Sequence, residues 1–345
     1  MTAPQPTPPQ LLDAATADRV RELELFALGR VQGVMQGANA SILKGFTSDF
    51  LQHRQYHPGD NLKYLDWRVY ARTDRLSIRE YEELTNSQLT VVVDISGSMR
   101  TGGSGRFTKH EFAVRSAAIL LTVACQQRDQ FSLALFRTGR IMQLPFRGGR
   151  SHLRRSLAAL VEQRADGETD FVQGLAESTS HVRRRGLVVV LSDFMDDPET
   201  ICRQLAALRH RHGDVIALQV FDPREADLDF NSVTRFHDPE SGGVLVVDPV
   251  LVRQEYARAF AAHADAIGEG CRRHGFDHAL LPVDDDCIRP LAAYLRARGA
   301  ADRPLLESMR AAALAGRGRF DRRLSTAEQI AIYAHPGGQG RSQAS

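Results

Sequence analysis

The sequence predicts an α/β fold: a doubly wound, mostly parallel β-sheet covered by helices. Residues 89–93 form a run of β-prone residues with three consecutive valines, and residues 187–191 form a second run that is entirely apolar. Runs with apolar side chains on both faces are typical of strands buried inside a parallel sheet. Between the two runs, residues 108–128 carry a small apolar helical face that can pack on such a sheet.

The residues before the first run predict a helix and then a highly charged segment. Apolar residues three or four positions apart predict a helix over residues 11–35, namely Val20, Leu23, Ala27, Val31 and Val34. A turn at Gly59-Asp60 and an alternating pattern over residues 67–80 predict strands. The charges of residues 57–83 have two interpretations. We favour internal ion pairs that anchor the segment, because both signs alternate, over a surface for a partner.

The rest of the chain continues the alternation of strands and helices. A turn at Thr138-Gly139 predicts that residues 130–136 and 140–146 pair as an edge hairpin. Apolar runs also predict strands over residues 214–221 and 279–283, and a short hairpin is expected around residues 240–243. Further helices are expected over residues 151–163, 170–184, 198–211, 250–274 and 284–299, and one in the tail over residues 302–314.

Composition and charge argue against several classes of protein. The chain has 44 Lys and Arg against 42 Asp and Glu, so nothing indicates a basic surface for nucleic acid. No segment reaches the roughly 18 consecutive apolar residues that a membrane span requires, and the Pro-rich, polar start lacks the core of a signal peptide. The 4 cysteines form no CxxC pair, which fits reduced thiols better than a zinc site. We therefore expect a cytoplasmic protein.

Oxygen-bearing side chains follow the first buried run. Asp94, Ser96 and Ser98 occupy alternate positions, and Gly97 allows a turn tight enough for them to point at one spot. One carboxylate and two hydroxyls suit Mg²⁺ or Mn²⁺, and they would leave the ion under-neutralised and open to a further acid. The competing interpretation is a strand end closed by hydrogen bonds from side chains to the backbone, without a metal.

A later strand end has the same chemistry. The second apolar run ends in Ser192 and Asp193. In an open α/β sheet, ligands bind beyond the carboxyl ends of the strands where the strand order reverses. Adjacent strands are only about 4.8 Å apart, so Asp94 and Asp193 can face one ion.

Several other residues compete for a place at this edge. The loop residues Thr169 and Asp170 open a helical pattern, and either could supply an oxygen to the ion. Asp196 and Asp197 lie just beyond Asp193 and are more often helix caps than ligands. Whether Asp170, Asp196 or Asp197 contributes to a metal site stays open at the level of the sequence.

Two blocks of residues resemble known families. The set Asp94-x-Ser96-x-Ser98, Thr169 and Asp193 resembles the metal-ion-dependent adhesion site of von Willebrand factor A domains. Upstream, another block is similar to the one that precedes this domain in the bacterial DUF58 family. That block reads His57-Pro58-Gly59-Asp60-Asn61-Leu62-Lys63-Tyr64-Leu65-Asp66-Trp67-Arg68, then Ala71-Arg72 and Arg79-Glu80-Tyr81-Glu82-Glu83.

The resemblance implies a domain layout and a partner. Residues 1–10 would be a disordered arm, 11–87 a segment packed on the A domain, 88–299 the A-like domain and 300–345 a mobile tail. Mg²⁺ or Mn²⁺ would be held by Asp94, Ser96, Ser98, Thr169 and Asp193. The metal would take an Asp or Glu carboxylate from a partner protein. The resemblance also implies an adaptor that works with a MoxR-class AAA+ ATPase in the maturation or assembly of other proteins.

The residues favour such a binding module over an enzyme. A metal-dependent phosphohydrolase with Asp94 as nucleophile usually needs a carboxylate two residues later as general acid, and Ser96 stands there. No lysine follows Lys109 in the chain, so none is expected beside the later strand ends. A third possibility is a structural A domain without metal, in which Ser96 and Ser98 only form turns.

Overall fold

The computed structural model describes most of the chain between residues 14 and 299. The described residues are 14–35, 49–55, 69–70, 76–82, 88–102, 107–137, 140–167, 171–178, 186–228, 230, 232–237, 243–284 and 288–299. In these parts of the chain, no helix is long and apolar enough to cross a membrane. The predicted arm (1–10), the tail (300–345) and its helix (302–314) lie outside the described residues.

A six-stranded sheet forms the centre of the molecule. Its strands are β3 (Gln88–Asp94), β4 (Gln130–Arg137), β5 (Arg140–Arg147), β6 (Gly186–Ser192), β7 (Gly213–Phe221) and β10 (Asp277–Pro282). Their order is β10-β7-β6-β3-β4-β5, and only β5 runs antiparallel to its neighbour. Counted from β3, this is the doubly wound order 3-2-1-4-5-6, whose chain reversal lies between β3 and β6. The predicted fold class is confirmed.

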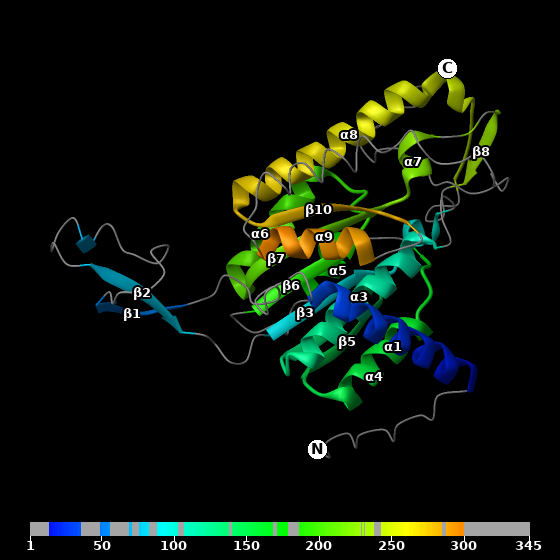
Figure 1. Ribbon diagram of the computed structural model, residues 1–345. Helices are drawn as coiled ribbons and strands as arrows, with labels where there is room; N and C mark the ends of the chain where they lie inside the picture. Colours follow the sequence, from blue (N-terminus) through cyan, green and yellow to red (C-terminus); the bar gives the residue numbers. More distant parts are fainter. Residues whose placement is uncertain are drawn as a thin grey trace, which may run out of the picture.

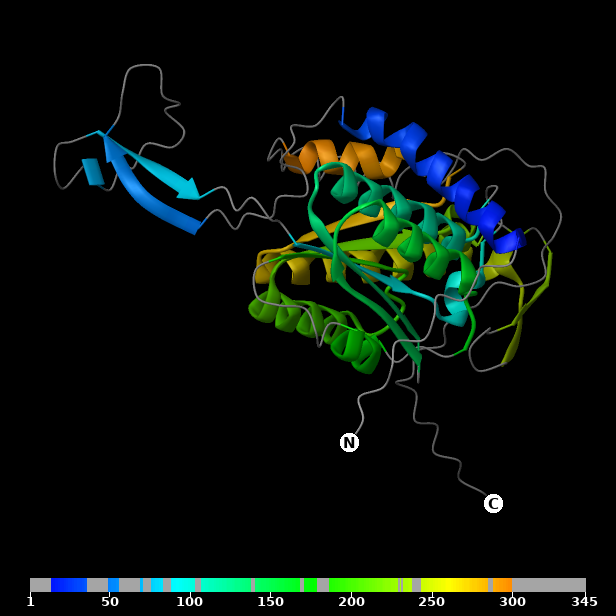
Figure 2. The ribbon, with the colours of Figure 1, turned by 90° about the horizontal axis from the view of Figure 1, so that it is seen from below.

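Helices cover both faces of this sheet (Figures 1 and 2). On one face lie α1 (Ala14–Met35), α3 (Lys109–Gln126), α4 (Arg150–Glu162) and α9 (Ile288–Gly299). On the other face lie α5 (Phe171–Ser178), α6 (Pro198–His212) and α8 (Pro249–His274). The sheet is therefore enclosed between two layers of helices, and in the first layer α1 packs on α3, α4 and α9.

Alternation along each central strand divides the apolar interior into two cores. In β3, Val91 and Val93 join the core under α1, α3, α4 and α9, whereas Val92 joins the core under α5, α6 and α8. All three valines are fully buried. This two-sided burial explains why the strand sequences lack polar alternation.

Smaller elements surround the sheet. The 3-10 turn η2 (Gly97–Arg100) follows β3, and the short helix α7 (Pro223–Asp227) follows β7. Strands β8 (Thr234–His237) and β9 (Val244–Val247) pair as the predicted hairpin. Strands β1 (Asp49–Gln55) and β2 (Ser77–Glu82) form a second antiparallel pair. That pair stands to the side of the sheet in Figure 1, whereas α1 packs on α3 and α4.

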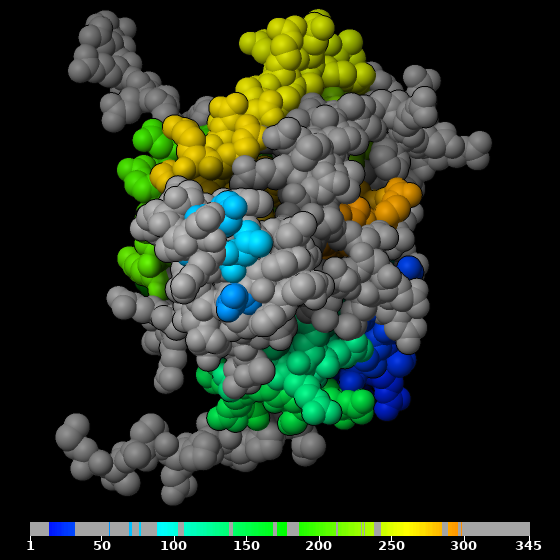
Figure 3. All heavy atoms as spheres, turned by 60° about the vertical axis from the view of Figure 1, so that its left-hand side comes forward, coloured from blue at the N-terminus to red at the C-terminus, as the bar shows by residue number. Residues whose placement is uncertain are grey.

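The molecule's outer faces carry helices of both layers. In the space-filling view of Figure 3, α8 crosses the upper part of the face and α1 lies at its lower right.

At the amino edge of the sheet, Arg298 of α9 forms ion pairs with Asp214 and Asp277, and it is only 6% exposed. A buried cation thus joins the starts of β7 and β10.

Two predictions for the N-terminal segment need correction. The alternating pattern over residues 67–80 does not form strands throughout, because residues 69–70 are helical and β2 begins only at Ser77. The partner of β2 is β1, in a stretch of mixed aromatic and charged residues that predicted no strand. In so charged a segment, alternation of polar and apolar residues is a weak guide to register. How the rest of residues 11–87 packs on the A-like domain stays a prediction.

Two helical glycines provide a test of this packing. A Cβ atom on Gly174 of α5 would lie 2.4 Å from Cδ2 of Phe136, whereas one on Gly29 of α1 would meet nothing within 4 Å. We expect Gly174→Ala to lower the free energy of unfolding by roughly 1–3 kcal/mol through overpacking. The control Gly29→Ala should raise it by roughly 0.5–1 kcal/mol, because alanine favours the helix. Urea denaturation measures both, and equal stability of the two variants would contradict the packing of α5 on β4.

Candidate metal centre

Four of the five predicted ligands lie at the carboxyl edge of the sheet, at the point of chain reversal. Asp94 is the last residue of β3, and Asp193 directly follows β6. The two strands are paired in parallel, with Val93 opposite Leu191. Asp94, Ser96, Ser98 and Asp193 are all buried, with exposed fractions of 4% or less. We refer to these four residues as the candidate metal centre.

Hydrogen bonds shape the loop after β3. The backbone N–H of Ser96 donates to Asp94 Oδ1 at 2.9 Å, and the hydroxyl oxygens of Ser96 and Ser98 lie 2.9 Å apart. The N–H of Gly97 donates to the carbonyl oxygen of Gly167 at 2.7 Å. This bond joins the loop after β3 to Gly167. Residues 168–170, and with them Thr169 and Asp170, lie outside the described residues.

Among the described residues, buried Asp94 forms no ion pair with a cation. Its Oδ2 accepts a hydrogen bond from the Ser192 hydroxyl at 2.7 Å, and Ser192 in turn accepts one from the N–H of Phe194. Burial, and then the negative charge of Asp193, raise the pKa of Asp94 from 3.8 to about 7. The carboxylate form of Asp94 therefore calls for a positive charge that its hydrogen bonds do not supply.

A lysine enters the same edge from α3. Lys109, the first residue of that helix, is 1% exposed, and its Nζ lies 2.9 Å from Asp193 Oδ2 and 2.9 Å from Glu225 Oε2. Burial lowers the pKa of Lys109, but Asp193 and Glu225 outweigh it and hold that pKa above its usual value. Burial also raises the pKa of Glu225 to about 7, although Lys109 opposes the rise. The expectation that no lysine stands beside the later strand ends was wrong.

The backbone around Asp193 is fixed by buried side chains. Gln219 of β7 donates from Nε2 to the carbonyl oxygen of Asp193 at 3.0 Å. The next residue, Phe194, has a φ of 51° in the left-handed region, and its carbonyl oxygen lies 2.9 Å from Nε2 of His263. These contacts hold Asp193 in one position at the strand end.

The acids beyond Asp193 form local turns. Asp197 caps α6 by accepting a hydrogen bond from the N–H of Thr200 at 2.8 Å. Asp196 accepts a hydrogen bond from the N–H of Asp197 at 2.7 Å. The preferred interpretation of these two residues as capping or turn residues agrees with these bonds.

The donor set of the centre fits a hard cation. Two carboxylates and two hydroxyls are the oxygen ligands that Mg²⁺ and Mn²⁺ accept in proteins. In the described part of the chain, no group of three or more His, Cys, Asp or Glu side chains is suited to a metal. Within the described residues, no hydrogen bond uses Asp193 Oδ1, which leaves that atom available.

Sequence reasoning missed three residues of this edge. Ser192 could have been identified, because it immediately precedes Asp193 at a strand end. Lys109 and Glu225 come from helices 116 residues apart and are brought together only by the fold. The sequence indicates their position only in that each residue follows the carboxyl end of a predicted strand, Lys109 in the next helix and Glu225 in the next loop.

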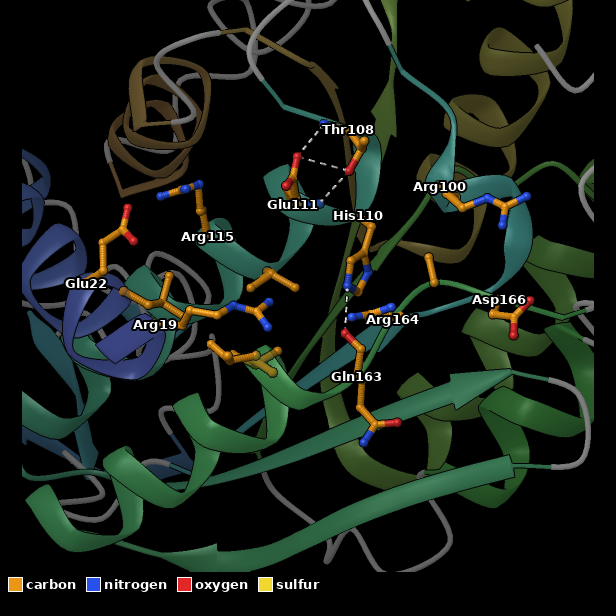
Figure 4. Close-up of a pocket in the computed structure, with 15 residues that line it drawn as sticks. Arg19, Glu22, Arg100, Thr108, His110, Glu111, Arg115, Gln163, Arg164 and Asp166 are labelled. Atoms are coloured by element: carbon orange, nitrogen blue, oxygen red, sulfur yellow. Dashed lines mark hydrogen bonds between the residues drawn. The ribbon is translucent and has the colours of Figure 1, made fainter. Parts of the chain in front are cut away.

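A cleft of about 690 Å³ lies next to the loop after β3, between α1, α3 and the end of α4 (Figure 4). Of the described residues, none of the four in the candidate metal centre lines it. Its walls include Arg19, Arg100 and Arg164 together with acidic residues, so its charge is mixed. His110 is held there by Nε2, which lies 3.2 Å from the carbonyl oxygen of Gln163. The chemistry of the metal centre is thus separate from this cleft.

Solved structures resemble parts of this chain at low sequence identity. The protein BatB from Bacteroides thetaiotaomicron matches 63% of this chain and 100% of its own, with a TM-score of 0.40 and 14% identity. The VWA domain of SpRpn10 matches 64% of this chain and 96% of its own, with a TM-score of 0.34 and 12% identity. These scores are too low to carry an argument, and the fold assignment rests on the strand order.

Relatives in sequence come from mycobacteria. Uncharacterized proteins of Mycobacterium tuberculosis and Mycobacterium bovis are each 30% identical over 301 residues, which cover 84% of this chain and 94% of theirs. An uncharacterized protein of Mycobacterium avium is 29% identical over 161 residues, 45% of this chain and 94% of its own. A family model described as "Protein of unknown function DUF58" matches residues 52–266, so this chain belongs to the DUF58 family.

Proposed function

We propose that this protein is a metal-dependent protein-interaction module. Mg²⁺ or Mn²⁺ would be held by Asp94, Ser96, Ser98, Thr169 and Asp193. The observation that carries the proposal is the environment of Asp94. Asp94 is a buried carboxylate beside a second carboxylate and two hydroxyls that lie close together, and none of the described cationic side chains contacts it. Such a site is costly to a folded protein unless a cation enters it.

The donor set also suggests what the metal does. Lys109 already neutralises part of Asp193, so two carboxylates and neutral hydroxyls leave a divalent ion with net positive charge. A bound metal of this kind supplies a Lewis-acidic position for an oxygen ligand from outside the chain. A carboxylate of an Asp or Glu on a partner protein fits that position in charge and in ligand type. This chain's own role is to hold the donors rigidly on strand ends and to keep water out of the centre.

The partner we propose is a MoxR-class AAA+ ATPase. This step rests on the resemblance described above and on membership of the DUF58 family. In this proposal the protein is a cytoplasmic adaptor in the maturation or assembly of other proteins, and it is not an enzyme.

One observation revives an enzymatic alternative. Lys109 lies beside the strand ends, where a phosphohydrolase would use a cation next to its nucleophile. However, both oxygens of Asp94 already accept hydrogen bonds, and Ser96 stands in place of the general acid. We expect no Mg²⁺-dependent turnover of p-nitrophenyl phosphate by the purified protein. Turnover that is lost in Asp94→Asn would establish the phosphohydrolase instead.

Replacing Asp94 by asparagine tests the metal centre through stability. Because folding raises the pKa of Asp94 from 3.8 to about 7, stability should fall as pH rises through that range. In EDTA near pH 8, Asp94→Asn should therefore have a higher melting temperature than wild type. Its free energy of unfolding should be higher by a few kcal/mol at most. Near pH 5 the difference should shrink. Addition of Mg²⁺ or Mn²⁺ should raise the melting temperature of wild type only.

The control for this experiment is Asp18→Asn, which changes an exposed carboxylate on α1. It should retain both the pH profile and the metal response of wild type. A metal response that survives in Asp94→Asn would remove Asp94 from the ligand set. Absence of any response in wild type would favour the metal-free structural domain.

Binding of the ATPase tests the proposed partner. The purified MoxR-class ATPase of the same organism should be retained by immobilised wild type in Mg²⁺, and not in EDTA or by Asp94→Ala. The physical reason is that the metal bridges the two proteins. Retention should be measured with ATP and with ADP bound to the ATPase. No retention in either nucleotide state would exclude this partner, and retention that ignores metal and mutation would move the contact surface away from the centre.

A further inference from the structure

We propose that Lys109 is a built-in cation that competes with the metal for Asp193. Glu225 also pairs with Lys109 and thereby sets how strongly the lysine competes. The inference rests on the proposed metal-binding function and concerns the regulation of the same site. Lys109 and the metal would compete for the carboxylate of Asp193. The metal affinity of the protein would then depend on how much of the ammonium charge Glu225 takes up.

The geometry places one cation between two acids. Lys109 reaches from the first position of α3 to Asp193 after β6 and to Glu225 on α7, at 2.9 Å in both cases. Its side chain is 1% exposed, so water does not replace either contact. Three separate elements of the fold thus meet at a single ammonium group.

The described surroundings of Glu225 add negative charge. Asp222, which is 2% exposed, caps α7 beside it and raises the pKa of Glu225 further. Burial, and then the negative charge of Glu225, raise the pKa of Tyr256 on α8. In the described residues, the ion pairs of Glu225 and Asp193 involve Lys109 alone. Within the described residues, the edge that holds Asp94, Asp193 and Glu225 therefore has more carboxylates than cations paired with them.

A metal at the centre would share Asp193 with this lysine. Lys109 contacts Oδ2, and Oδ1 is the oxygen left for the metal. Two cations on one buried carboxylate repel each other strongly, because the protein interior screens charge poorly. Each would weaken the hold of the other. Glu225 relieves this repulsion by neutralising Lys109 from the far side.

This arrangement predicts opposite effects of two substitutions. Lys109→Met keeps the length of the side chain but removes the competing charge, so the metal should bind more tightly. Glu225→Gln leaves the whole ammonium charge on Asp193, so the metal should bind more weakly. If Lys109 only held α3 against the sheet, both substitutions would destabilise the same contacts. Metal affinity would then not change in opposite directions.

The test is Mn²⁺ titration by calorimetry on the full-length protein, with melting temperature in EDTA as a second measurement. Relative to wild type, Lys109→Met should bind Mn²⁺ on the order of tenfold more tightly, and Glu225→Gln on the order of tenfold more weakly. In EDTA, Lys109→Met should melt well below wild type, because it leaves buried carboxylates unpaired. The double variant decides whether Glu225 acts through Lys109: in the Lys109→Met background, Glu225→Gln should have little effect.

Arg298→Met is the matched control. It removes another buried cation with two acidic partners, at the opposite edge of the sheet. It should lower the melting temperature and leave Mn²⁺ affinity unchanged. If it alters affinity as Lys109→Met does, the effect reflects general destabilisation and the inference is overturned.

The outcomes separate this inference from the proposed function. If wild type binds no Mn²⁺, the metal centre itself is wrong. If wild type binds and both single variants shift in the same direction, only the role of Lys109 is wrong. If Lys109→Met does not fold in EDTA, Glu225→Gln decides alone, and unchanged or tighter Mn²⁺ binding in that variant overturns the inference.

Discussion

Burial of two carboxylates at one edge of the sheet is the constraint on which the site depends. Asp94 and Asp193 are each at most 4% exposed at the ends of paired strands. Removing such groups from water is costly unless charge or hydrogen bonds compensate. Ser192 and the backbone N–H of Ser96 donate hydrogen bonds to Asp94, and Lys109 forms an ion pair with Asp193. The pKa of Asp94 nevertheless stays near 7. Strongly shifted pKa values of this kind cluster at functional sites.

The two edges of the sheet handle buried charge differently. At the amino edge, Arg298 is paired with Asp214 and Asp277, an arrangement that holds strands and helix together. At the carboxyl edge, Lys109 pairs with Asp193 and Glu225, and no other described cation forms an ion pair with them. The first arrangement is closed and structural. The second has an excess of negative charge on rigid strand ends, as expected where ligands bind in doubly wound sheets.

The sequence was informative where chemistry follows local pattern. The valine run before Asp94 and the apolar run before Asp193 predicted both strands, and their parallel pairing placed the two acids together. Lys109 was misjudged because distance along the chain says nothing about which helix crosses the strand ends. Residues 67–80 were misjudged because charged alternation does not specify a strand. Thr169 lies outside the described residues, so its role as a ligand remains a prediction.

The edge strand β5 limits how this protein can meet its partners. It runs antiparallel to β4 and contains Pro145, which has no N–H to offer a further strand. The register of the pair also shifts between Phe131 and Leu133, which bends the edge. A proline and a bulge are features that stop sheets from joining edge to edge. Association by strand addition is therefore disfavoured at β5.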